Sequence, residues 1–270
     1  MAIDALHRWI MVLDVEGFST RLDPPQGMLR EEMYRVLDES QAEAGLAAGD
    51  LDVEDRGDGA LLVARPDLPP RLLAGRFVRA LHDVLLERSQ GTDSGYGLRL
   101  RLSMHQGLAS PDPRGWSGDA VNMAFRLVDC EPLRTALRSA VGSPLVFAVS
   151  DTVFHDVIRH GYRSIDPAGY LPADIEIKHG VRTRAWITVP GLPAPPGLGR
   201  TTARAGAAQG ESPAPGRDRD PRAVSEPASA SAPRTQGFAR STVFHIGTVE
   251  GDAVGGDKYV GLEPPRRGDR

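Results

Sequence analysis

The sequence predicts an α+β fold in which helices pack on a mainly antiparallel sheet. Short apolar runs typical of strands alternate with segments whose apolar residues recur every three or four positions, as in amphipathic helices. Two pairs of expected strands are joined by short connections and so indicate hairpins. The chain has 270 residues, 40% of them hydrophobic and 25% charged, which is enough for one domain with its own core and further segments beside it.

The first third of the chain indicates a buried strand, a helix and a hairpin. Residues 9–13 are a continuous apolar run, as in a central strand. Apolar residues at 29, 33, 36 and 37 then follow helical spacing. Residues 51–54 and 60–63 flank Gly57-Asp58-Gly59, and Asp-Gly tolerates the positive φ of a tight turn. These elements are therefore expected to be strand, helix, strand and strand in order.

The rest of the predicted domain continues the alternation of helices and strands. Strict alternation of apolar and polar residues over 98–104 indicates a strand with one buried face. Ser150 is expected to cap a short helix that runs through Ile158. Apolar spacing and residue type predict the other elements, which are helices at 73–85 and 119–137, a strand at 145–149, and a second hairpin formed by 170–177 and 183–189.

Composition divides the chain into four parts. It changes sharply near Pro190, so residues 1–190 are expected to form the folded domain. Residues 191–237 are rich in Pro, Ala and Arg with few large aliphatic residues, so they should be a disordered linker. Residues 238–263 combine β-branched residues with frequent glycines and form a β-prone motif, followed by a disordered end at 264–270.

Several classes of protein are disfavoured by composition. A net charge of −4 argues against a nucleic-acid binder that works through bulk positive charge. No run approaches the roughly 18 apolar residues of a membrane-spanning helix, and the N-terminus lacks the features of a secretory signal. The single cysteine, Cys130, excludes an intramolecular disulfide framework. We therefore expect a cytoplasmic protein without nucleic-acid or membrane partners.

Two aspartates are the first candidates for chemistry. Asp14 follows the apolar run of the first strand, and Asp58 lies in the turn of the first hairpin. If the first strand pairs beside that hairpin, the two carboxylates meet at the same end of the sheet. Neighbouring carboxylates repel each other unless a cation lies between them, and hard oxygen ligands suit Mg²⁺ or Mn²⁺. Taken singly, Asp14 could be a loop cap, and Asp58 is better explained as an ordinary turn residue.

The third predicted helix carries the next candidates. Asn122 and Arg126 are four positions apart and so share one helix face. Val121, Phe125 and Val128 form a different, apolar face that is expected to pack on the sheet. An amide beside a guanidinium is suited to hold a ribose and a phosphate.

Four motifs in this order resemble the class III nucleotidyl cyclase domain. They are Asp-x-x-Gly-Phe-Ser at 14–19, Gly-Asp-Gly at 57–59, Met-His-Gln-Gly at 104–107 and Gly-Asp-x-Val-Asn-x-Ala-x-Arg at 118–126. The resemblance covers roughly residues 8–190. It implies a ferredoxin-like βαββαβ core with added elements and a head-to-tail homodimer whose active sites lie at the interface.

The resemblance also implies an enzyme and a role for each candidate residue. Asp14 and Asp58 would bind two Mg²⁺ or Mn²⁺ ions on one subunit, while Asn122 orients the ribose and Arg126 contacts the triphosphate from the other. The reaction would convert a nucleoside triphosphate to a cyclic nucleotide and pyrophosphate, in a signalling or defence pathway.

The chain departs from the family pattern at the base-reading and transition-state positions. Glu54 occupies one base-reading position, where glutamate goes with guanine, and Gly115 occupies the other, so a pyrimidine base stays open as well. Gly180 stands in register with the transition-state lysine, which leaves Lys178 and Arg182 as candidates to reach the phosphates. The alternative function is therefore a catalytically degenerate, nucleotide-binding effector or adaptor.

The β-prone segment resembles short amyloid signalling motifs. Phe244-His245-Ile246-Gly247 is similar to their core, and Val249-x-Gly-Asp recurs as Val254-x-Gly-Asp. Such segments can stack in register between chains, which implies a protein partner with a similar β-motif. A frayed tail with chance β-propensity is the equally weighted alternative.

Overall fold

The computed structural model describes residues 4–21, 25–89, 97–178 and 180–199. The greater part of the expected linker, the β-prone segment at 238–263 and the end at 264–270 lie outside these described residues. Residues 191–199, which the sequence assigns to the linker, are described, and Leu198 among them packs against the core. Packing against the core therefore continues beyond residue 190, at least as far as Leu198.

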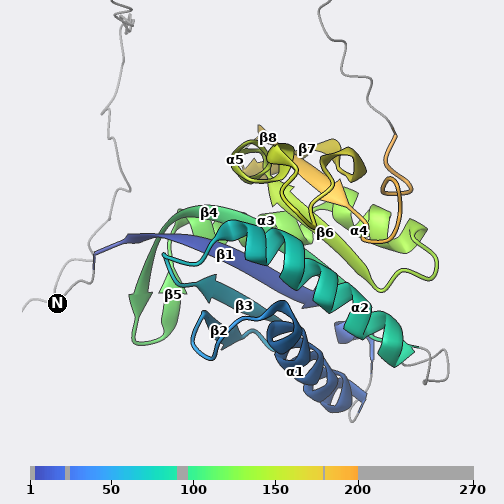
Figure 1. Cartoon of the computed structure of the whole chain (residues 1–270), viewed down its shortest axis with the longest axis horizontal. Helices are drawn as coiled ribbons and strands as arrows, with labels where there is room; N and C mark the ends of the chain where they lie inside the picture. The colour runs from blue at the N-terminus through green and yellow to red at the C-terminus, as the bar shows by residue number, and fades with distance from the viewer. Residues whose placement is uncertain (1–3, 22–24, 90–96, 179, 200–270) are drawn as a thin grey trace, which may run out of the picture. The chain divides into compact units, whose positions relative to one another are not determined.

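The described chain alternates strands and helices as the sequence predicts (Figure 1). Its main elements are β1 (Leu6–Val15), α1 (Pro25–Ala44), β2 (Leu51–Asp55), β3 (Gly59–Ala64), a π-helical segment (Leu72–Phe77), α2 (Val78–Ser89), β4 (Leu100–Asp112), β5 (Gly115–Ser117), α3 (Asp119–Asp129), α4 (Glu131–Ser139), β6 (Leu145–Ser150), α5 (Asp151–Asp156), β7 (Leu171–Lys178) and β8 (Val181–Thr188). The first six regular elements are thus a βαββαβ unit, and Ser150 caps α5 through its hydroxyl as expected.

The sheet has the strand order β2-β3-β1-β4-β6-β8-β7, with β5 paired to the end of β4. The β4–β6 pair is parallel and the other pairs are antiparallel. The α+β class and the mainly antiparallel sheet are therefore confirmed. The strand at 9–13 is central, since β1 lies between β3 and β4.

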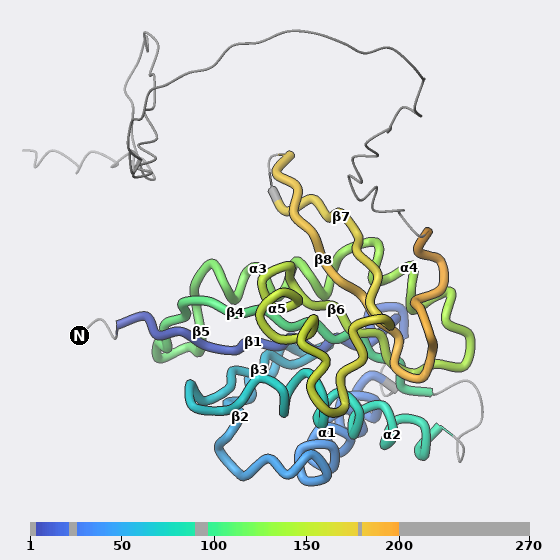
Figure 2. Tube along the Cα trace, turned by 45° about the horizontal axis from the view of Figure 1, so that its top comes forward, coloured from blue at the N-terminus to red at the C-terminus, as the bar shows by residue number. Residues whose placement is uncertain are grey.

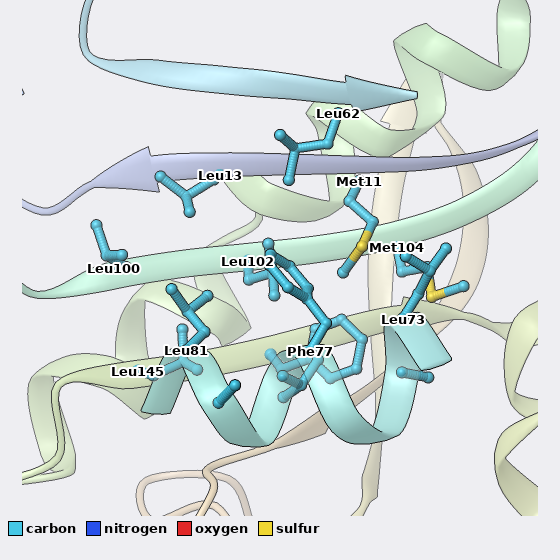
Figure 3. Packing of buried hydrophobic residues seen from close by; sticks show 14 of the residues in the cluster. Met11, Leu13, Leu62, Leu73, Phe77, Leu81, Leu100, Leu102, Met104 and Leu145 are labelled. Carbon is cyan, nitrogen blue, oxygen red and sulfur yellow. The ribbon is translucent and has the colours of Figure 1, made fainter. Parts of the chain in front are cut away.

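Helices cover both faces of the sheet, and each face has its own apolar cluster. Met11 and Leu13 of β1 belong to the cluster beneath α1 and α2, whereas Ile10 and Val12 belong to the cluster beneath α3 and α4. Successive residues of a strand point to opposite faces, which is why this strand reads as a continuous apolar run. Figure 3 shows Leu73, Phe77 and Leu81 packed against the first of these faces.

Two expectations for β4 and the third helix need correction. The expected helix at 119–137 is broken at Cys130, whose backbone is extended (φ −68°, ψ 144°), so that α3 and α4 are separate. Pro132 explains the break, because a proline in a continuous helix lacks the N–H donor and clashes with the preceding turn. The polar side of β4 is also partly covered, since Ser103 is buried and donates to the carbonyl oxygen of Ala124 (2.7 Å).

None of the helices that the structure describes is both long and apolar enough to cross a membrane.

Candidate functional site

The pairing of β1 with β3 brings Asp14 and Asp58 together. Asp14 lies opposite Gly59 in the ladder, and the N–H of Val15 donates to the carbonyl oxygen of Asp58 (2.9 Å). A Cβ atom on Gly59 would lie 2.1 Å from the carbonyl oxygen of Leu13, so only glycine allows this approach. The condition set by the sequence, that the first strand pairs beside the hairpin, is therefore met.

The two carboxylates have different surroundings. Asp14 lies directly across from Arg101 of β4, and its side chain is 18% exposed. Burial raises the pKa of Asp14, Arg101 lowers it, and the negative charges of Asp58 and Asp129 raise it further. Asp58 is exposed and has no ion pair or side-chain hydrogen bond with the described residues. The site thus combines a partly buried carboxylate and a free one.

Helix α1 anchors the turn that carries Asp58, which the sequence did not predict. Arg30 and Tyr34 of α1 both contact the carboxylate of Asp55, with the Tyr34 hydroxyl donating at 3.0 Å. The same carboxylate accepts the N–H of Gly57 (3.0 Å). Asp55 therefore ties the β2–β3 turn to the helix, and the only sequence signal for it was an acidic residue beside the turn.

Asn122 and Arg126 lie one turn apart on α3, away from its buried face. Val121 and Val128 are buried, and Phe125 packs at the edge of the same cluster, as the apolar spacing predicts. Asn122 is exposed and Arg126 half-buried. Neither side chain forms a hydrogen bond or ion pair with the part of the chain that the structure describes. Both polar groups are thus free to contact something outside this chain.

Glu54 and Gly115 face each other. Oε1 of Glu54 is buried without a hydrogen-bond partner among the described residues, while Oε2 pairs with Arg56 at 2.5 Å. A Cβ atom on Gly115, which has φ +127°, would lie 2.2 Å from Oε1. No side chain can therefore stand at 115 while Glu54 keeps this position. A buried acceptor without a donor is costly unless a bound group supplies one.

The guanidinium of Arg56 lies 5.4 Å from the centre of the Phe125 ring. This contact connects the Glu54 strand with α3, the helix of Asn122 and Arg126. Asp14 is instead near Asp129 at the other end of α3, seven residues and about 10 Å of helix from Asn122. Within one chain Asn122 therefore lies about two helical turns from the end of α3 near Asp14, whereas Arg126 lies only three residues from Asp129.

Lys178 and Arg182 lie on the hairpin of β7 and β8, whose tip projects beyond the body of the domain (Figure 2). Arg182 is opposite Glu176 in the ladder and is exposed. Lys178 ends β7, and its side chain is outside the described part of the structure. The backbone therefore places both residues near the hairpin tip rather than beside Asp14 or Glu54.

The surroundings of His105 and Cys130 indicate that these residues stabilise the fold rather than take part in chemistry. His105 is largely buried and its Nδ1 lies 2.8 Å from the Ser150 hydroxyl, and burial lowers its pKa to about 4. Burial raises the pKa of Cys130 to about 11, so this thiol stays protonated and unreactive at neutral pH.

The fold is that of adenylate/guanylate cyclase domains. The chain is similar to the solved structure of an adenylate/guanylate cyclase/hydrolase from Silicibacter pomeroyi, with 20% identity over 70% of this chain and 100% of that chain and a TM-score of 0.52. The guanylate cyclase domain of RhGC from Catenaria anguillulae in complex with GTP is also similar, with 17% identity over 70% of this chain and 98% of that chain and a TM-score of 0.46. The adenylyl cyclase CyaB from P. aeruginosa is similar with 16% identity over 73% of this chain and 100% of that chain and a TM-score of 0.46.

No protein-family model matches the chain, and no curated protein does. At 20% identity the likeness establishes the architecture, and the chemistry has to be argued from the residues themselves.

Proposed function

We propose that this chain is a metal-dependent nucleotidyl cyclase that converts a nucleoside triphosphate to a cyclic nucleotide and pyrophosphate. The observation that carries the proposal is the approach of Asp14 and Asp58 at the β1–β3 pair of a cyclase-like fold. Neighbouring carboxylates repel each other, and a divalent ion bound by both would offset that repulsion.

The aspartates fit a magnesium or manganese site that is completed by the substrate. Their oxygens are hard donors, and Asp58 has no competing cation among the described residues. The described chain has no cluster of three or more His, Cys, Asp or Glu residues that could hold a metal alone. Mg²⁺ is commonly held by one or two carboxylates together with substrate phosphates. Asp14, Asp58 and the triphosphate would then together hold the two ions of the expected site.

The active site is proposed to form between two chains in a head-to-tail homodimer. One chain supplies Asp14 and Asp58, and the other supplies Asn122 and Arg126. The separation of Asn122 from Asp14 along α3 and the lack of partners for Asn122 and Arg126 among the described residues support this arrangement. A cyclic two-fold dimer would contain two such sites.

In the proposed reaction the ribose 3′-oxygen forms a bond to the α-phosphorus, and the bond from that phosphorus to the oxygen of the β-phosphate breaks. The 3′-hydroxyl proton passes to solvent, and pyrophosphate leaves. Bound Mg²⁺ or Mn²⁺ supplies Lewis-acid stabilisation of the charge on the reacting oxygens. Asn122 orients the ribose, and Arg126 neutralises charge on the triphosphate. Lys178 and Arg182, at the hairpin tip, would reach the phosphates of a site on the partner chain.

Glu54 is the proposed base-reading residue. Its buried Oε1 lacks a donor among the described residues, and an N–H of a base would supply one. Because Gly115 offers no side chain, Glu54 and its partner Arg56 would read the base together. Guanine follows from the family pattern, and a pyrimidine remains the second candidate because both kinds of base carry N–H donors.

One observation favours the alternative, a degenerate cyclase that binds a nucleotide as an effector or adaptor. Gly180 stands where the family pattern has the transition-state lysine, and its backbone has φ +77°, as a tight turn requires. Loss of such a cation costs on the order of 10²–10³ in rate by analogy with an oxyanion-hole donor. Binding without turnover is the behaviour that this alternative predicts.

The deciding experiment is incubation of the purified full chain with ATP, GTP, CTP and UTP in turn, each with Mn²⁺, and identification of products by mass spectrometry. The proposal predicts one cyclic nucleotide and an equal amount of pyrophosphate. The Asp58→Ala variant serves as the inactive control. Nucleotide binding by calorimetry without any product would instead support the effector role, and neither binding nor product would contradict both.

A further inference from the structure

The carboxylate of Asp14 is already engaged by a cation of the same chain. Arg101 lies directly across the β1–β4 pair and donates from Nε (2.8 Å) and from Nη2 to one oxygen, Oδ2. The other oxygen, Oδ1, accepts no hydrogen bond from the described residues and is not among their buried unpartnered atoms. One oxygen of Asp14 is therefore occupied and the other is open.

The Arg101 contact differs from the surface ion pairs of the molecule. The side chain of Arg101 is 12% exposed, whereas most arginines in the other described pairs are more than a third exposed. Leu100 and Leu102, its neighbours on β4, are fully buried on the opposite face, so the strand cannot slide to release it. Limited access to water strengthens the interaction between charges in such a pair.

We propose that Arg101 is a competing cation at the candidate metal site, which holds Oδ2 of Asp14 in the nucleotide-free protein and weakens the binding of a divalent ion there. This inference rests on the proposed function, since it assumes that Asp14 and Asp58 are the ligands. A divalent ion held by these carboxylates would lie close to the guanidinium, and the two cations would repel each other. Asp58, which has no such partner, is then the first ligand to bind.

The arrangement links metal binding to nucleotide binding. Without a nucleotide, the positive charge of Arg101 satisfies Asp14 and leaves little net negative charge to attract a second cation. A triphosphate brings several negative charges to the same place, which offset the repulsion. The ion is therefore expected to bind weakly by itself and strongly together with the nucleotide.

The test is binding of Mn²⁺ to the full chain without nucleotide, measured from the electron paramagnetic resonance signal of the free ion. Arg101→Met removes the charge, and Arg101→Gln removes it while keeping a hydrogen-bond donor to Asp14. Both neutral variants are expected to bind Mn²⁺ about tenfold more tightly than the unmodified chain. Adding Asp58→Ala to Arg101→Met should abolish the gain, which assigns it to this site.

Matched controls separate the local effect from net charge and from misfolding. Arg65→Met removes the same charge from an exposed pair with Asp67 and should leave Mn²⁺ binding unchanged. Arg101→Lys keeps the charge, and its affinity should stay within about twofold of that of the unmodified chain. Circular dichroism and thermal unfolding of each variant show whether it is folded, and a misfolded Arg101→Met leaves the comparison to Arg101→Gln and Arg101→Lys.

Unchanged or weaker Mn²⁺ binding in the folded neutral variants would overturn the inference and make Arg101 a positioning residue for Asp14. That result leaves the proposed function standing if the unmodified chain still forms a cyclic nucleotide. If the chain neither binds Mn²⁺ with a nucleoside triphosphate nor turns it over, the proposed function fails first.

Discussion

Asp14 and Asp58 differ in their surroundings, although the proposed function gives them the same task. Asp14 is partly buried and paired with Arg101, whereas Asp58 is exposed at a turn and lacks a partner among the described residues. Loss of Asp14 would therefore leave a poorly hydrated guanidinium unpaired, while loss of Asp58 removes only a ligand. A substitution of Asp58 therefore tests metal binding with less disturbance of the fold than a substitution of Asp14.

For Asp58→Ala we expect activity with Mn²⁺ to fall at least about 100-fold with little change in stability, because removing a shared ligand weakens metal binding. Surface substitutions usually change stability by about 0.5 kcal/mol or less. Cyclic nucleotide formation and thermal unfolding measure the two effects. Activity close to that of the unmodified chain would exclude Asp58 as a ligand.

The lowered pKa of His105 predicts that the stability of the fold depends on pH. Burial, with a smaller contribution from His7, lowers its pKa from the usual 6.5 to about 4. Between these values the unfolded chain binds a proton that the folded chain does not, so stability should fall as pH drops from about 6.5 to 4. The contribution is on the order of 3 kcal/mol.

The measurement is the free energy of unfolding in urea across this pH range, compared between the unmodified chain and His105→Gln. Glutamine can still hydrogen-bond to Ser150 but does not titrate, so the slope in this window should be smaller in the variant. Equal slopes would show that His105 is protonated in the folded chain near its usual pKa.

At the scale of elements, the position of α3 depends on a glycine of β4. A Cβ atom on Gly107 would lie 2.8 Å from the Cβ atom of Ala120 in the first turn of α3. Gly107→Ala should therefore destabilise the fold by about 1–3 kcal/mol, as overpacking does, and displace the helix that carries Asn122. Gly97→Ala is the matched control, since nothing lies within 4 Å of a Cβ atom there. Equal unfolding midpoints of the two variants would contradict this.

The β-prone segment is tested as a peptide. Residues 238–263 are too few to bury a core alone, so the sequence predicts slow conversion to a cross-β assembly by the native peptide. Ile246→Pro removes a ladder donor and should prevent this. Thioflavin fluorescence and fibre diffraction compare the two peptides. A native peptide that stays monomeric at high concentration, with and without partner motifs, would remove the assembly role.

Local patterns predicted most elements, because strand and helix periodicity reflect burial on one or both sides. The break at Cys130 was missed although Pro132 signalled it, since the apolar spacing of α3 continues into α4. The Asp14–Arg101 pair was beyond prediction, because it depends on the register of two strands 87 residues apart. The sequence shows that Gly115 departs from the family pattern. It does not show that the carboxylate of Glu54 occupies the space that a side chain at 115 would need.

At the scale of the whole molecule, the proposed function gives each chain two halves of a site, with Asp14 and Asp58 in one half and Asn122 and Arg126 in the other. Asp14 lies near Asp129 at one end of α3, and Asn122 lies about two helical turns away, beyond Phe125. A head-to-tail dimer would bring the first half of one chain to the second half of its partner. The central claim is therefore that the active site is shared between two chains.

Mixing two inactive variants tests that claim most directly. Asp58→Ala lacks a metal ligand and Arg126→Ala lacks a phosphate contact, so each homodimer should be inactive. In a heterodimer one of the two sites keeps all its residues, and random exchange should restore about a quarter of the activity of the unmodified chain. Cyclic nucleotide formation by the mixture, with heterodimers verified by native mass spectrometry, is the measurement. Restored activity is the result that the shared site predicts, and heterodimers as inactive as the separate variants would contradict it.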